Sequence, residues 1–112
     1  NSYFIYFEYA QTTLGYAILT YPEKHGRTLH YTAALRDFFV PDDSDNSFTL
    51  GAVMLAYIAA HCRTMALASL RLDFRSCEAN ILLQALLQSL LPEQPLNSTS
   101  IVLNDQQLAL LA

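Results

Sequence analysis

The chain has 112 residues, of which 53% are hydrophobic and 14% charged, and its net charge is −4. So apolar a composition excludes a disordered segment, and an acidic chain with six basic residues does not suit a nucleic-acid binder. No apolar run reaches the roughly 18 to 20 residues that span a bilayer, so no membrane is expected. We predict a single domain over residues 1–112. The absence of an initiator Met leads us to expect that it is cut from a longer polyprotein or multidomain chain.

The stretch from Tyr3 to Tyr21 predicts two β-strands, about Tyr3–Tyr9 and Leu14–Tyr21, joined by the polar turn Gln11-Thr12-Thr13. Aromatic and β-branched residues are frequent in both strands, which suits a pleated and largely buried surface. Glu8 ends the first of them. An ionised carboxylate in an apolar strand is costly unless it is paired or holds a cation, so Glu8 is the first candidate functional residue.

Pro22 to Gly26 reads as a turn, and a third strand is predicted from Arg27 to about Leu35. Pro41 to Ser47 is the most hydrophilic segment and predicts an exposed loop. A helix follows through about Arg63, with Ser47 or Thr49 as its cap.

Alternating apolar residues from Leu70 to Phe74 predict a fourth strand. Ser76 is the expected cap of a second helix, which carries a leucine stripe and ends at Pro92. A fifth strand is expected at Thr99–Leu103. A last helical turn follows, capped by Asn104 or Asp105, with its apolar residues between Leu108 and Leu111.

The predicted order of elements is therefore β-β-β-α-β-α-β-α. The first three strands should form an antiparallel meander, and the later two should join in parallel through right-handed crossovers. The result is an α/β domain with a mixed five-stranded sheet and helices on its faces.

Several short sequences, in order, resemble the ribonuclease H domains of Ty3/gypsy-type reverse transcriptases. The opening Phe7-Glu8-Tyr9-Ala10, the turn, and Leu14-Gly15-Tyr16-Ala17-Ile18-Leu19 are similar to the start of those domains. Weaker similarities follow at Gly26–His30, Leu55–Ile58, Leu70–Asp73 and Asn104–Leu110. The resemblance implies a ribonuclease H-like fold in a retrotransposon-derived protein. It also implies that strand one lies beside strand four, with Glu8 close to Asp73.

The same resemblance implies which carboxylates would be catalytic. The family cleaves the RNA strand of RNA–DNA hybrids with two Mg²⁺ ions, which need several converging carboxylates. Here Glu8 replaces the expected aspartate, Val53 stands where a glutamate is expected, and Leu108 stands where the last acid is expected. Asp73 is present, and Asp105 is a candidate substitute for the last acid. We therefore expect a degenerate, inactive domain without a cofactor.

Three hypotheses remain open. The first is a non-catalytic structural or protein-interaction module, intracellular, whose partner is a neighbouring domain, another protein or a second copy. The alternative is an active Mg²⁺-dependent ribonuclease H that uses Glu8, Asp73 and Asp105. The third is an unrelated α/β domain whose element order matches by chance. Cys62 and Cys77 are expected to be reduced packing residues rather than zinc ligands.

Overall fold

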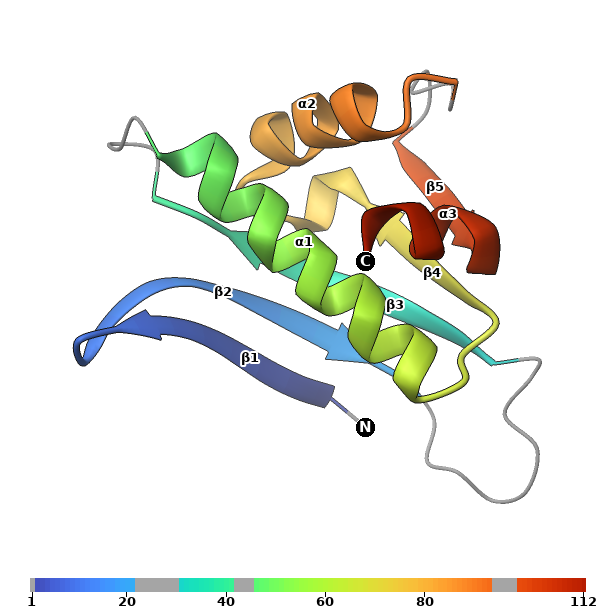
Figure 1. Cartoon of the computed structure of the whole chain (residues 1–112), viewed down its shortest axis with the longest axis horizontal. Helices are drawn as coiled ribbons and strands as arrows, with labels where there is room; N and C mark the ends of the chain where they lie inside the picture. Colours follow the sequence, from blue (N-terminus) through green and yellow to red (C-terminus); the bar gives the residue numbers. More distant parts are fainter. Residues whose placement is uncertain (1, 22–30, 42–45, 94–98) are drawn as a thin grey trace.

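The computed structural model describes residues 2–21, 31–41, 46–93 and 99–112 (Figure 1). In chain order its elements are β1 (Ser2–Tyr9), β2 (Thr12–Thr20), β3 (Thr32–Phe39), α1 (Ser47–Thr64), β4 (Ser69–Asp73), the 3₁₀ turn η1 (Phe74–Ser76), α2 (Asn80–Leu90), β5 (Ser100–Asn104) and α3 (Asp105–Leu111). The predicted α/β class is confirmed. No helix of the described ranges is long and apolar enough to cross a membrane.

The strands form one mixed sheet in the order β1-β2-β3-β4-β5. β1, β2 and β3 are antiparallel neighbours, as predicted, and β4 joins β3 in parallel. The prediction that β5 adds in parallel is wrong, because β5 runs antiparallel to β4. The prediction that strand one lies beside strand four is also wrong, because β1 is an edge strand and β3 is the neighbour of β4.

The lengths of the elements explain this order. An 18-residue helix is about 27 Å long, and the eight residues of β3 span about the same distance. α1 therefore returns the chain to the start of β3, where β4 begins with Ser69 opposite Thr32. After β4 the chain starts β5 with Ser100 opposite Asp73, at the end where β4 finished, so β5 has to run antiparallel.

The core lies between the sheet and the three helices. α1 and α3 cross in front of the sheet, and α2 lies beside α1 (Figure 1). An ideal Cβ on Gly51 of α1 would lie 2.8 Å from Leu86 of α2, so a glycine allows these two helices to approach closely. The largest fully buried side chains come from both layers: Leu19, Leu35, Phe38, Met54, Leu55, Ile58, Leu70, Leu72, Leu83, Leu86, Leu87 and Leu103.

Several predicted boundaries change. β3 continues to Phe39, and the predicted start of this strand at Arg27 lies outside the described residues. Neither Ser47 nor Thr49 is the N-cap of α1, because Asn46 occupies that position. Ser76 belongs to η1, and α2 begins only at Asn80. The cap at Asn104 is confirmed, since its side chain accepts a hydrogen bond from the backbone N–H of Gln107 in a capping box.

The β1–β2 hairpin turns through Ala10 and Gln11 rather than through the predicted Gln11-Thr12-Thr13. Tyr9 pairs with Thr12, and the two turn residues have φ angles of 50° and 67°. Two successive residues with positive φ are typical of a type I′ turn, which favours Asn or Gly because side chains are strained there.

Replacing Gln11 by glycine should therefore stabilise the protein by about 1 kcal/mol, since the strain of a left-handed side chain is removed. The matched control is Gln106→Gly, in exposed helix α3, where the same exchange should cost about 1 kcal/mol of helix stability. Chemical denaturation measures both. A destabilising Gln11→Gly would show that the turn does not need positive φ.

Candidate functional site

The three predicted site carboxylates lie in separate parts of the domain. Glu8 is exposed near the end of edge strand β1, and Asp73 ends β4. Three strand spacings of about 4.8 Å separate β1 from β4, roughly 14 Å in all. Asp105 opens α3, where it pairs with Arg63 of α1 at 3.4 Å.

Each aspartate has a local structural role. Asp73 Oδ1 accepts a hydrogen bond from the backbone N–H of Arg75 at 3.0 Å and lies 3.7 Å from the Arg75 guanidinium. Such exposed pairs contribute little to stability. Within the described ranges no three His, Cys, Asp or Glu side chains could hold one metal ion. The structure therefore does not bring Glu8, Asp73 and Asp105 together.

The notable polar group is instead Asp37, which is not among the predicted site residues. β3 pairs with β4 only as far as Leu35 and Leu72. β4 then leads into η1, and β3 continues to Phe39 without a paired strand on the β4 side. A bulge in the β2–β3 pairing leaves Arg36 unmatched, since Ile18 pairs with Asp37 and Leu19 with Leu35. Asp37 therefore lies where the two parallel strands separate.

The Asp37 carboxylate joins three segments at this point. Its Oδ1 accepts hydrogen bonds from the backbone N–H groups of Phe38 and Glu78, both at 2.8 Å, and its Oδ2 accepts one from the Tyr16 hydroxyl at 2.9 Å. This hydrogen bond, followed by burial, raises the pKa of Tyr16. The backbone N–H of Ala79 also donates to the Phe38 carbonyl at 2.9 Å. We refer to these contacts as the Asp37 clamp.

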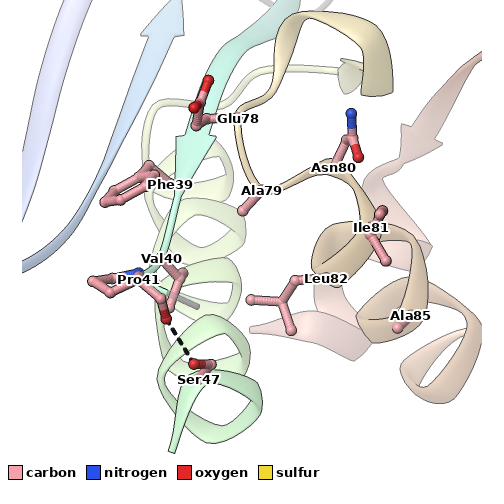
Figure 2. A pocket seen from close by; sticks show the side chains of 10 residues that line it. All are labelled: Phe39, Val40, Pro41, Ser47, Glu78, Ala79, Asn80, Ile81, Leu82 and Ala85. Carbon is pink, nitrogen blue, oxygen red and sulfur yellow. Dashed lines mark hydrogen bonds between the residues drawn. The ribbon is translucent and has the colours of Figure 1, made fainter. Parts of the chain in front are cut away.

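A cavity of about 460 Å³ opens beyond the clamp, between the end of β3, the start of α1 and α2 (Figure 2). Its lining is mostly apolar, and its residues are Phe39, Val40, Pro41, Ser47, Glu78, Ala79, Asn80, Ile81, Leu82 and Ala85. The Ser47 hydroxyl donates to the Pro41 carbonyl at 2.7 Å, which fixes the start of α1 against the end of β3. A second hollow of about 280 Å³ adjoins it along α2 and shares Ile81 and Ala85.

The charge near the cavity is negative. Glu78 is its only charged lining residue within the described part of the chain. An apolar cavity with a carboxylate in its lining suits a ligand that is apolar and either neutral or positively charged.

The two cysteines offer no reactive site. Cys62 and Cys77 are free and buried, which confirms the expected packing role. Burial raises the pKa of each thiol to about 11, so neither is a thiolate at neutral pH.

An aromatic cluster covers the other end of α1. The Tyr21 hydroxyl lies 3.1 Å from His61 Nε2, and the Tyr21 ring stacks on Tyr3. Burial and the neighbouring Tyr3 raise the pKa of Tyr21 to about 12.

Comparisons with known proteins support the fold alone. No protein-family model and no curated protein matches the chain. A solved structure that is similar is that of a mutant of the toxin AtaT bound to the C-terminus of the antitoxin AtaR, with a TM-score of 0.52 and 15% sequence identity. The similarity covers 88% of this chain and 63% of the AtaT chain, so this chain spans less than two thirds of that protein.

Proposed function

We propose that the domain is a non-catalytic protein-interaction module that binds an apolar, basic segment of a partner protein in the cavity beyond β3. The observation that carries the proposal is the apolar lining with the carboxylate of Glu78 among its described residues. Leu82 and Ile81 offer surface for an aliphatic side chain, and Glu78 offers a carboxylate to a lysine or arginine.

The shape of the site favours an extended segment over a compact molecule. The cavity and the adjoining hollow follow one face of α2 over Ile81, Ala85 and Gln88. Ile81 is 81% exposed and lines both hollows, so it adds accessible apolar surface to the site. The AtaT structure offers a precedent, since that toxin binds the C-terminus of another protein.

A phosphate-bearing group carrier such as coenzyme A is the second candidate for this cavity. It is favoured by one observation: α1 starts at the cavity with no acidic residue in its first turn, and helix N-termini attract anions. The carboxylate of Glu78 opposes it, because it would repel the phosphates.

A ribonuclease H-like origin stays a hypothesis that rests on the opening sequence alone. The strand order argues against it, since β1 and β4 are not neighbours. The alternative of Mg²⁺-dependent nuclease activity has no support in the positions of Glu8, Asp73 and Asp105.

Binding can be tested with a fluorescein-labelled nonapeptide of alternating leucine and lysine, followed by fluorescence anisotropy. We expect saturable binding that weakens as salt is raised, and no binding of the same peptide with glutamate in place of lysine. Ala85→Trp, which fills the cavity, should weaken binding at least tenfold. Ser89→Trp, on the same helix but outside the lining, should leave it unchanged.

Two results would overturn the proposal. Equal affinity of wild-type protein and Ala85→Trp for the peptide would place binding outside the cavity. Binding of unlabelled coenzyme A that is lost in Ala85→Trp would assign the cavity to the second candidate.

A further inference from the structure

The outer edge of β1 has the properties of a pairing surface. β1 is an eight-residue edge strand, it contains no proline or lysine, and Glu8 is its only charged residue. Proteins normally protect long edges with charge, proline or a short strand. The opposite edge follows that rule, since β5 has only five residues and leads directly into α3.

The side chains of β1 are apolar on both faces of the sheet. Phe4 and Tyr6, on the face opposite α1, are 61% and 59% exposed. On the helix face the rings are held in place, because Tyr3 stacks on Tyr21 with centroids 4.3 Å apart and Phe7 meets Tyr57 edge-on at 5.6 Å. An edge with ordered side chains loses little conformational entropy when it pairs.

The sequence of β1 is complementary to itself when two copies run antiparallel and centre on Ile5. In that register Phe4 lies opposite Tyr6 of the second copy, and Tyr3 lies opposite Phe7. Cross-strand aromatic pairs of this kind stabilise antiparallel sheets. Glu8 lies opposite Ser2 of the second copy, so the Glu8 carboxylates of the two copies do not face each other. Centring the pairing on Glu8 would set two carboxylates against each other.

We propose that a second copy of this chain pairs with β1 in that register and joins the two sheets into one continuous sheet. The contact is isologous, because the same strand serves both copies. It leaves the cavity beyond β3 accessible, so the dimer and the proposed partner binding are independent.

Sedimentation velocity across the micromolar range should show a concentration-dependent dimer. Phe4→Glu alone should abolish it. The double variant Phe4→Glu/Tyr6→Lys should restore it, because each introduced carboxylate then faces an introduced ammonium group of the second copy. Phe4→Lys/Tyr6→Lys is the matched control and should stay monomeric, since it places like charges opposite each other.

A covalent trap gives a second readout. Directly opposite Cα atoms lie within disulfide reach, so Ile5→Cys should form an intermolecular disulfide on mild oxidation, whereas exposed Val102→Cys on β5 should not. A wild-type protein that stays monomeric, or a double variant that fails to restore the dimer, would overturn the proposal.

Discussion

Replacing Asp37 by alanine should lower the free energy of unfolding by about 3 to 5 kcal/mol. The substitution removes three hydrogen bonds to a charged acceptor. Such bonds contribute about 1.5 to 3 kcal/mol each to the net stability, and the partial exposure of these three reduces their sum. For a domain of this size the melting temperature should fall by roughly 15 °C. Urea denaturation followed by circular dichroism measures the loss.

Two controls separate the parts of the Asp37 clamp. Tyr16→Phe removes only the hydroxyl hydrogen bond and should cost about 1 kcal/mol. Asp37→Asn keeps one acceptor oxygen for the N–H groups of Phe38 and Glu78, so its cost should fall between the other two. An Asp37→Ala protein as stable as Tyr16→Phe would mean that the two backbone contacts contribute nothing.

Replacing Gly15 by alanine should destabilise the protein by about 2 to 3 kcal/mol. A Cβ at this position would lie 2.7 Å from the Phe39 carbonyl oxygen and 2.9 Å from Met54 Sδ, and the backbone atom cannot move without shifting β3. Overpacking of this kind typically costs about 1 to 3 kcal/mol.

Gly51→Ala is the matched control for Gly15→Ala. Its Cβ would meet only Leu86 and Leu82 side-chain atoms, which can rotate away, and alanine favours the helix by about 1 kcal/mol. We expect a change of less than about 1 kcal/mol in thermal or urea denaturation. A Gly51→Ala protein as unstable as Gly15→Ala would show that the helices are packed as tightly as the strands.

The sequence predicts the elements of this domain better than their arrangement. Alternation with period two identifies β4 and β5, and the cap at Asn104 is a local signal, so each can be predicted from nearby residues. Alternation does not say which strand is the neighbour of which. The position of β4 beside β3 depends on how far α1 carries the chain back along the sheet, and a family resemblance led to the wrong neighbour.

The candidate site could not be predicted for a related reason. Asp37 accepts hydrogen bonds from Tyr16 and Glu78, which are 21 and 41 residues away in the sequence, so no local pattern predicts the clamp. The sequence holds one signal, a charged pair Arg36-Asp37 between Leu35 and Phe38 in an apolar strand. The cavity is lined by the end of β3 and the start of α2, and α2 starts only at Asn80, later than the predicted cap at Ser76.

The most direct test of the proposed interaction site is a two-dimensional ¹H–¹⁵N NMR titration of the full chain with the leucine–lysine peptide. We expect the largest saturable shifts at the amides of Val40, Ala79 and Leu82, which line the cavity, and little change at Val102 on β5. The largest shifts along β1, or no saturable shift at the cavity residues, would contradict the proposal that this domain binds a partner beyond the end of β3.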